Sequence, residues 1–367
     1  MPVGPIHPGS VGELTWSDSQ AALLQTVADE IDGATAPARR AVHLDWRHEL
    51  AVRGRLLGRL PSGRSSASDA CRILRSADGW IAISVARPWD VEVLPALVEG
   101  PVSDDHWMTL GCWVAGRPGA DVVRRARLLD MAAAELDLVA PDTPIPLSAT
   151  RRWPSRDAPD MSELRVVDLS SLWAGPLAAR VLSDAGATVT KVESVSRPDG
   201  ARETPDFYRH LHPADQSTVV VDLSSARGRD QLHGLVEAAD VVIEASRPRA
   251  LEQLGSGPEQ VRPKPGRVWL SITGYGRHGP GANWIAFGDD AAVAGGLTAR
   301  TDVGEPIFCA DAVADPVTGL FGAAAVLRSL AAGGGHLIDL ALAGAAAAVA
   351  RAGACASSGT LEPIWPS

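Results

Sequence analysis

The second half of the chain alternates short apolar runs with helical segments, and this alternation constrains the fold more than any other feature. Six runs rich in Val, Ile or Leu recur, over Leu164–Ser170, Ala187–Glu193, Thr218–Leu223, Asp240–Ala245, Val268–Thr273 and His336–Leu342. Short continuous apolar runs are typical of strands buried on both faces. Strands separated by helices form right-handed crossover units with parallel strands. We therefore predict an α/β fold with a parallel sheet covered by helices on both faces.

The first half shows a mixed pattern without this alternation. Helices are predicted over Ser19–Ile31, Trp46–Leu60, Trp89–Leu97 and Val122–Leu136, and two strands joined by a turn over Ala70–Leu74 and Trp80–Val85. The polar segment Leu147–Glu163 contains two prolines and no periodicity, so it is predicted to be a linker. We expect a small α+β domain with its linker over residues 1–160 and the parallel-sheet domain over residues 161–367.

Composition narrows the class of protein. The 367 residues carry a formal net charge of −10, which argues against a nucleic-acid surface. The N-terminal segment lacks the pattern of a signal peptide, and the apolar stretch Ala341–Ala350 is too short to cross a membrane, so we expect a cytoplasmic protein. We expect no metal site, because the histidines are isolated and the cysteines lack the spacing of metal ligands. The residues are His43, His48, His106, Cys71, Cys112, Cys309 and Cys355.

Candidate ligand-binding residues follow the predicted strands. The loop Ser171–Pro176 leads into a helix N-terminus, which favours an anion, or is simply a helix start. The glycines of a dinucleotide fingerprint are absent, although Glu193 ends the second strand. Arg247 could bind a phosphate or be solvated. The loop Gly274–Gly281 could let backbone approach a ligand or be a mobile connection.

Five ordered segments carry a family resemblance. They are VVDLSSLWAGPLAARVLSDAGATVTKVE, STVVVDLSSARGRDQL, ADVVIEASRPRALEQLG, SITGYGRHGPG and VADPVTGLFGAAAVLRSL, and together they span about Leu164–Ala350. This stretch resembles the N-terminal part of the class III coenzyme A transferases, the CaiB/BaiF-like family, which includes α-methylacyl-CoA racemases. The resemblance implies a Rossmann-like large domain, a smaller second domain and two interlocked subunits, in a homodimer or a heteromer with a related subunit.

The first half resembles the same family, but in an unexpected position. The segment CRILRSADGWIAISVARPWDVEVLPALV is similar to the small-domain segment that normally follows the large domain. The chain is therefore expected to be circularly permuted, or to be a segment cut from a tandem duplication.

The resemblance implies an acyl-CoA:carboxylate CoA-transferase with acyl-CoA and a carboxylic acid as substrates and no metal. Within VADPVTG, Asp315 matches the nucleophile of the family, which forms an aspartyl-CoA thioester. From the residues alone, an Asp before Pro316 also fits a helix N-cap.

Positions implied to contact coenzyme A are Trp173, Ala174, Ser194, Val221, Ala245, Ser246, Arg247, Gln253, Leu254 and Phe287. Several differ from the common family residues. Phe287 and Gly288 stand where the family has an acid or, in racemases, a His-Asp pair, and Asp289 or Asp290 could substitute only if the local helix shifts. Two alternatives follow, a catalytically weak CoA-binding subunit of a transferase complex and an acyl-CoA racemase or epimerase. Racemisation is disfavoured because the chain lacks the His-Asp pair, and with it the second acid/base group that a racemase needs.

Overall fold

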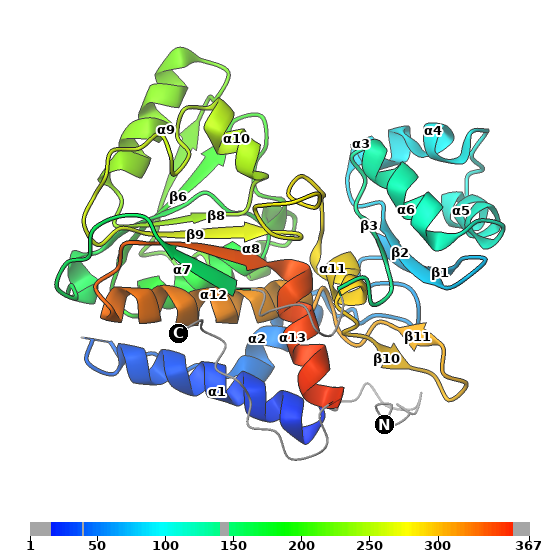
Figure 1. The fold of residues 1–367 in the computed structure, drawn as a ribbon, viewed down its shortest axis with the longest axis horizontal. Helices are drawn as coiled ribbons and strands as arrows, with labels where there is room; N and C mark the ends of the chain where they lie inside the picture. The colour runs from blue at the N-terminus through cyan, green and yellow to red at the C-terminus, as the bar shows by residue number, and fades with distance from the viewer. Residues whose placement is uncertain (1–15, 39, 140–146, 355–367) are drawn as a thin grey trace.

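The computed structural model describes residues 16–38, 40–139 and 147–354, and Figure 1 shows a large sheet between helices beside a smaller group of strands and helices. The large sheet has seven strands in the order β4-β12-β9-β8-β5-β6-β7. Their bounds are β4 (Leu147–Arg151), β5 (Arg165–Asp168), β6 (Thr188–Ser194), β7 (Ser217–Val221), β8 (Val241–Glu244), β9 (Val268–Thr273) and β12 (His336–Ala341).

Neighbouring strands of this sheet run parallel except β4, which pairs antiparallel with β12. Numbered along the chain, the six parallel strands lie in the order 3-2-1-4-5-6, which is that of doubly wound nucleotide-binding folds. The predicted α/β class is therefore confirmed. The linker predicted over Leu147–Glu163 is wrong at its start, because Leu147–Arg151 hydrogen-bonds to β12 as an edge strand.

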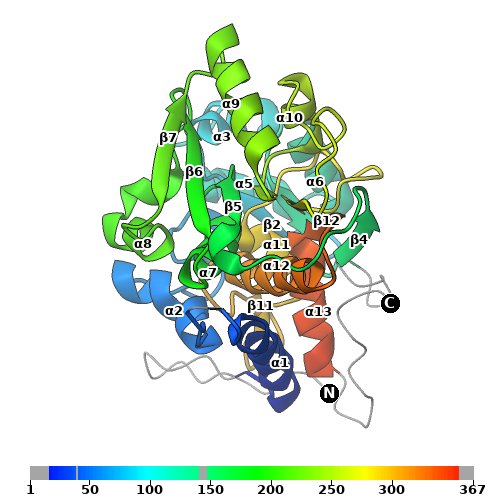
Figure 2. The same cartoon turned by 90° about the vertical axis from the view of Figure 1, so that its left-hand side faces the viewer.

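Alternate residues of the strands enter two separate cores. In β8, Val241 and Ile243 pack into the core on one face, whereas Val242 packs into the core on the other. The first face is covered by α1 (Asp18–Thr35), α7 (Ala174–Asp184), α12 (Ala314–Ala331) and α13 (Leu342–Ala354). The second is covered by α9 (Ala226–Ala238) and α10 (Pro248–Gln253), and Figure 2 shows the two layers from the side.

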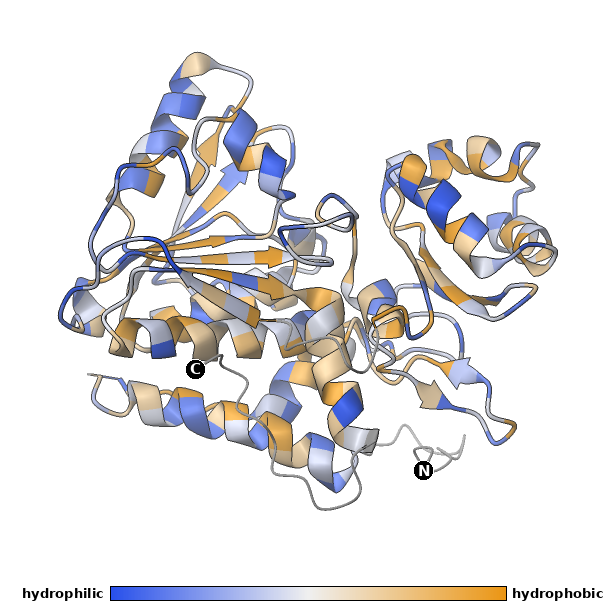
Figure 3. Ribbon diagram, viewed as in Figure 1, coloured by the Kyte–Doolittle hydropathy of each residue, from blue (hydrophilic) through white to orange (hydrophobic). Residues whose placement is uncertain are grey.

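Helix α12 lies at the centre of the first layer and is apolar almost throughout, as its predominantly orange ribbon in Figure 3 shows. It packs closely on α7, because a Cβ atom at Gly319 would lie only 2.7 Å from the carbonyl oxygen of Ala174. Since α12 leads into β12, which is parallel to β9, the N-terminus of α12 lies at the carboxyl edge of the sheet.

The smaller group, here called the small lobe (residues 71–135), contains β1 (Cys71–Arg75), β2 (Trp80–Ser84), β3 (Ala133–Glu135), α3 (Pro88–Glu92), α4 (Leu94–Val98), α5 (His106–Ala115) and α6 (Gly119–Leu128). The two predicted strands are confirmed as the antiparallel pair β1 and β2. The helix predicted over Val122–Leu136 is too long, because the chain turns at Asp130, with a φ of 56°, and then pairs with β2 as β3.

The helices before the small lobe pack against the sheet side of the molecule. Leu24, Val27 and Ile31 of α1 belong to the same core as α12, and α2 (Trp46–Leu57) contacts α12 and α8 (Pro205–Leu211). The division at residue 160 remains a prediction, but α1, α2 and β4 share the core of the parallel sheet. The 3-10 helices η1 (Met161–Glu163) and η2 (Gly200–Glu203) lie in connections.

The small lobe joins the sheet through α11 (Gly288–Ala294) and the hairpin of β10 (Ala299–Arg300) and β11 (Pro306–Ile307). Cys71 and Ile73 of β1 pack against Val293 and Phe308 in one buried cluster. Cys71, Cys112 and Cys309 are free thiols, and Cys355 lies outside the described residues. None of the helices in the described part of the chain combines the length and apolarity needed to span a membrane.

Candidate active site

Asp315 is the second residue of α12, at the carboxyl edge of the sheet. Its backbone N–H donates to the carbonyl oxygen of Ala312 at 2.9 Å, and its side chain is half-buried. The N-cap of the helix is Val313, so the N-cap role considered for Asp315 is wrong. The helix dipole in this first turn favours a negative charge, which suits a carboxylate nucleophile.

Three other carboxyl groups lie near Asp315, and the four together are here called the aspartate cluster. Asp289 accepts a hydrogen bond from the backbone N–H of Ala312 at 2.9 Å. Asp290 accepts one from the hydroxyl of Ser84 in the small lobe at 2.8 Å. The fourth member, Asp311, lies 3.3 Å from Nη1 of Arg53 on α2.

Burial raises the pKa of every member of the aspartate cluster. The pKa of Asp289 rises to about 8, and the pKa values of Asp290 and Asp315 rise to about 7. The neighbouring carboxylates of Asp290 and Asp311 raise the pKa of Asp315 further, whereas the guanidinium of Arg53 opposes the rise. Near neutral pH, Asp315 therefore exchanges between its neutral and ionised forms.

Gly288 packs directly against the carboxyl group of Asp315. A Cβ atom at Gly288 would lie 2.3 Å from the carbonyl oxygen of Ala312 and 2.8 Å from Cγ of Asp315. No side chain fits there, so the acid or His-Asp pair of the family has no equivalent at this position. The adjoining carboxyl groups of Asp289 and Asp290 are buried beside Asp315 instead.

The loop between β5 and α7 is held by a buried ionic network. Lys191 lies 2.9 Å from Oδ2 of Asp199 and 3.5 Å from Oδ2 of Asp168, and it also donates to the carbonyl oxygen of Ser170. Asp199 in turn accepts from the backbone N–H of Leu172 at 3.0 Å. The network fixes the chain immediately before α7.

Trp173 and Ala174 begin α7, and both are buried. Trp173 packs edge-on against Phe207, and the guanidinium of Arg53 lies 5.8 Å from its ring centre. Its side chain is 1 % exposed, so in this structure Trp173 is a core residue beside the aspartate cluster. Its role in coenzyme A binding remains a prediction.

Ser194 and Val221 end the neighbouring strands β6 and β7 and are directly paired in register. The hydroxyl of Ser194 is 3.0 Å from that of Ser196, and Val221 is buried. Glu193 is bound on both oxygens, by Arg202 at 2.7 Å and by the backbone N–H of Asp199 at 2.9 Å. It therefore serves the local fold and is not free to bind a ribose.

Ala245, Ser246 and Arg247 follow β8, at the point where the strand order reverses between β5 and β8. Ligands bind in the crevice beside such a switch point. Arg247 forms an ion pair with Asp130 of the small lobe, 2.9 Å apart. Arg247 thus links the two parts of the molecule at the edge where a ligand is expected.

The remaining predicted contacts are more widely spread. Gln253 is exposed and Leu254 half-buried at the end of α10, on the other face of the sheet from α12. Phe287 is the N-cap of α11, and the guanidinium of Arg87 lies 5.9 Å from its ring centre. Phe287 therefore precedes Gly288, which contacts Asp315, and Trp173 lies near Arg53, whose charge lowers the pKa of Asp315. Gln253 and Leu254 have no such connection to Asp315 in the described structure.

Several polar residues of the site had no signal in the sequence. Arg53 and Ser84 reach the aspartate cluster from α2 and β2, more than two hundred residues earlier in the chain. The end of β8 also carries a buried acid, Glu244, which binds Arg277 at 2.6 Å. That ion pair and a bond from the Arg277 backbone to Asp339, at 2.9 Å, anchor the loop Gly274–Gly281.

One group among the described residues could hold a metal ion. His48, Glu49 and His210 have ligand atoms within 4.8 Å of one another, so His48 is not isolated as predicted. However, the carboxylate of Glu49 is already bound by Arg180 at 2.7 Å and by His210 at 3.0 Å. A guanidinium next to the ligands would repel a divalent cation.

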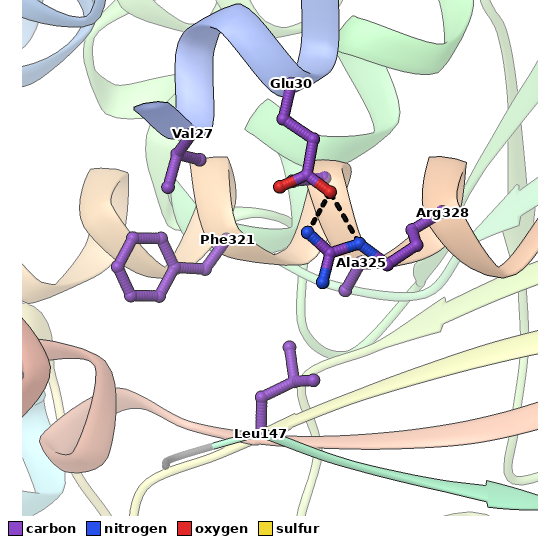
Figure 4. A pocket seen from close by; sticks show the side chains of 7 residues that line it. Val27, Glu30, Leu147, Phe321, Ala325 and Arg328 are labelled. Atoms are coloured by element: carbon purple, nitrogen blue, oxygen red, sulfur yellow. Dashed lines mark hydrogen bonds and ion pairs between the residues drawn. The ribbon is translucent and has the colours of Figure 1, made fainter. Parts of the chain in front are cut away.

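A small pocket lies away from the aspartate cluster. Figure 4 shows it between α1, α12 and β4, where the ion pair of Glu30 and Arg328 closes one side. Its lining residues are Val27, Glu30, Leu147, Phe321, Ala324, Ala325 and Arg328. It lies roughly two to four helical turns along α12 from Asp315, so it is separate from the candidate active site.

A comparison with family models matches residues 161–362 to the model described as CoA-transferase family III. The chain is 33% identical over 210 residues to a succinate–glutarate CoA-transferase of Agrobacterium fabrum, covering 50% of this chain and 51% of that protein. It is 33% identical over 187 residues to a probable fatty acyl-CoA transferase of Mycobacterium tuberculosis, covering 48% of each.

Solved structures show the same partial overlap. A CaiB/BaiF family protein from Brucella suis is 28% identical with a TM-score of 0.44, covering 52% of this chain and 55% of that one. The chain spans about half the length of the curated relatives it matches. The family match begins at residue 161 and so does not include α1, α2, the small lobe or β4.

Proposed function

The chain belongs to CoA-transferase family III, and we propose that it transfers coenzyme A from an acyl-CoA to a carboxylic acid with Asp315 as the nucleophile. The observation that carries this proposal is the carboxyl group of Asp315 itself. It stands in the first turn of α12, at the carboxyl edge of a doubly wound sheet, and packs closely against Gly288.

In the proposed reaction, a carboxylate oxygen of Asp315 attacks the thioester carbonyl and releases the coenzyme A thiolate, leaving a mixed anhydride. The thiolate attacks the Asp315 carbonyl and releases the first carboxylic acid, leaving an aspartyl-CoA thioester. The incoming carboxylate attacks this thioester, and the released thiolate attacks the new acyl carbonyl and frees Asp315. Covalent catalysis of this kind replaces one difficult exchange by several easier steps.

Electrostatics in the aspartate cluster fit this chemistry. Asp315 must be ionised to attack, and Arg53 is the cation that opposes the rise of its pKa to about 7. Asp289 and Asp290, whose pKa values rise to about 8 and about 7, limit the negative charge around it when they are protonated. A carboxylate that is partly buried and only just ionised near neutral pH is poorly solvated and therefore reactive.

For coenzyme A we propose the crevice beside the switch point between β5 and β8. Ser246 and Arg247 follow β8, and Trp173 and Ala174 follow β5, so both pairs stand at this edge of the sheet. We also propose that the small lobe acts as the displaced small domain of the family, and that a second copy or a related subunit completes the assembly.

A trapping experiment tests the covalent step. The protein is incubated with a panel of acyl-CoA thioesters, quenched with hydroxylamine or borohydride, and digested for mass spectrometry. We expect a hydroxamate or a reduced side chain on Asp315, absent in Asp315→Asn and present in Asp302→Asn, which changes an exposed aspartate. No adduct with any thioester, or an adduct that persists in Asp315→Asn, would contradict the mechanism.

A second candidate is a CoA-binding subunit without its own turnover. The observation that favours it is the ion pair of Arg247 with Asp130, because a phosphate would have to compete with that carboxylate. Titration calorimetry with coenzyme A separates the candidates when read beside the trapping result. Binding without any Asp315 adduct supports the silent subunit, and an adduct excludes it.

A further inference from the structure

The guanidinium of Arg127, on α6 of the small lobe, has an unpaired edge inside the molecule. Its Nε and Nη2 atoms are buried and have no hydrogen-bond partner among the described residues. These two atoms form the side of a guanidinium that binds a carboxylate with two parallel hydrogen bonds. A buried cationic donor without an acceptor is costly, so such a group calls for an explanation, and a bound anion is one.

Aromatic side chains hold Arg127 in place. Its guanidinium carbon lies 3.6 Å from the ring centre of Trp284 and 5.3 Å from that of Tyr275. The two rings pack edge-on, with their centres 5.4 Å apart. Stacking on a ring restrains the guanidinium plane while leaving its N–H edge free to bind. The arrangement is therefore a preformed support for Arg127.

Tyr275 supplies a third donor at the same place. Its Oη is also buried without a hydrogen-bond partner in the described part of the chain. Burial raises the pKa of Tyr275 and the adjacent guanidinium of Arg127 opposes this rise, but the net shift is upward, so the hydroxyl keeps its proton and can donate. An arginine side edge and a tyrosine hydroxyl together offer three donors, which is a common composition for a carboxylate site.

This site lies beside the nucleophile, but it does not include it. Arg127 lowers the pKa of Asp290, whereas the cation that acts most strongly on Asp315 is Arg53. Trp284, on which Arg127 stacks, is four residues before Gly288, which packs against the carboxyl group of Asp315. The side chain of Arg127 is therefore supported by the same segment that contacts Asp315.

We propose that Arg127 and Tyr275 bind the non-reacting carboxylate of a dicarboxylic substrate, so that this chain transfers coenzyme A to or from dicarboxylic acids. The inference rests on the proposed function, because the other end of the same substrate must reach Asp315. Arg127 lies outside the family match, which begins at residue 161, whereas Tyr275 lies inside it.

The test compares acceptors of equal length that differ by one carboxylate: succinate with butyrate, glutarate with pentanoate, and adipate with hexanoate. We expect the wild-type protein to prefer a dicarboxylate by kcat/KM. Arg127→Met should lower kcat/KM for that dicarboxylate by roughly 10- to 100-fold, the loss expected for charge-assisted hydrogen bonds. Values for the monocarboxylate should change by less than about threefold.

Variants separate binding from support of the fold. Arg127→Lys keeps the charge but loses the two-bond edge, so it should recover only part of the preference. Tyr275→Phe should lower kcat/KM for the same dicarboxylate by a smaller factor than Arg127→Met does. Arg124→Met is the matched control, since Arg124 is exposed on the same helix and pairs with Asp121 at 2.8 Å. Urea unfolding of each variant shows whether it is folded.

Two results would overturn the inference: no preference for dicarboxylates in the wild-type protein, or an equal loss for both acceptors in Arg127→Met. If no acceptor accepts coenzyme A, the proposed function fails, and calorimetry with the three dicarboxylates tests the site directly. Binding that Arg127→Met abolishes supports the carboxylate site, and no binding by the wild-type protein overturns it.

Discussion

Gly288 lies so close to Asp315 that a Cβ atom on it would stand 2.8 Å from Cγ of the aspartate. The same atom would lie 2.3 Å from the carbonyl oxygen of Ala312, which is backbone and cannot move aside as a side chain can. Ala312 also holds Asp289 through its N–H and Asp315 through its carbonyl oxygen. The glycine therefore determines where the carboxyl group of Asp315 stands.

Gly288→Ala should displace Asp315 and lower both stability and CoA transfer. Overpacking of a filled site costs about 1–3 kcal/mol of unfolding free energy. Misplacing a catalytic group by about 1 Å costs roughly 100-fold in rate. Urea unfolding and kcat/KM with the best acyl-CoA measure the two effects.

The matched control is Gly234→Ala, since Gly234 is exposed inside α9 and an added Cβ meets nothing within 4 Å. It should leave the rate unchanged and stabilise α9 by about 1 kcal/mol, because alanine is the better helix former. If Gly288→Ala transfers coenzyme A as fast as the wild-type protein, the close approach to Asp315 has no part in catalysis.

The parallel sheet was predictable because each of its parallel strands is a separate apolar run. Val268–Thr273 was predicted to the residue, since buried strands need apolar side chains on both faces. Strand β4 was not predictable, because an edge strand with burial on one side only, such as Leu147–Arg151, carries polar residues and resembles a loop. The end of α6 was missed for a similar reason, since alanines at 132–134 fit a helix as well as a strand.

At the candidate site, the residues predicted from the family segments all fall in the second half of the chain. Asp315 lies in the first turn of a helix, as expected, although not at its N-cap. Arg53 and Ser84 reach the aspartate cluster from the first half of the chain, and Arg127 stacks on Trp284 beside it. Their roles depend on contacts between segments far apart in sequence, and such contacts leave no local pattern in a single chain. Only packing of α2 and the small lobe against α11 and α12 brings them together.

Stability should fall as pH rises from about 4 to about 8. The folded-state pKa values of Asp289, Asp290 and Asp315, at about 8, 7 and 7, exceed the ordinary value of an unfolded aspartate. The folded protein thus binds more protons, and its stabilisation, complete below about pH 4, is lost as these groups ionise. Asp290→Asn should flatten this slope, by up to about 1.4 kcal/mol per pH unit. Urea unfolding from about pH 4 to about pH 8 measures the unfolding free energy of both proteins. If stability of the wild-type protein does not fall with pH, or if Asp290→Asn leaves the slope unchanged, the raised pKa values of these aspartates are wrong.

Lys191→Met should be strongly destabilising. It leaves the buried carboxylates of Asp168 and Asp199 without their cation and frees the loop before α7. Removing one partner of a buried ion pair costs about 3–5 kcal/mol. Arg209→Met, which breaks an exposed pair with Asp206, should cost about 1 kcal/mol or less. Urea unfolding measures the loss of unfolding free energy in both variants. Equal losses would show that the buried Lys191 network stabilises the fold no more than an exposed ion pair does.

Arg53→Met should shift the pH dependence of CoA transfer to higher pH. Arg53 lowers the pKa of Asp315 against burial, so without it the carboxyl group ionises later and the rising limb of kcat/KM moves above about pH 7. Arg53→Lys should shift the limb less, because it keeps the charge. Arg55→Met, which changes an exposed residue of the same helix, is the control and should keep the wild-type profile. A lower rate at every pH with the limb unmoved would mean that Arg53 only supports the fold.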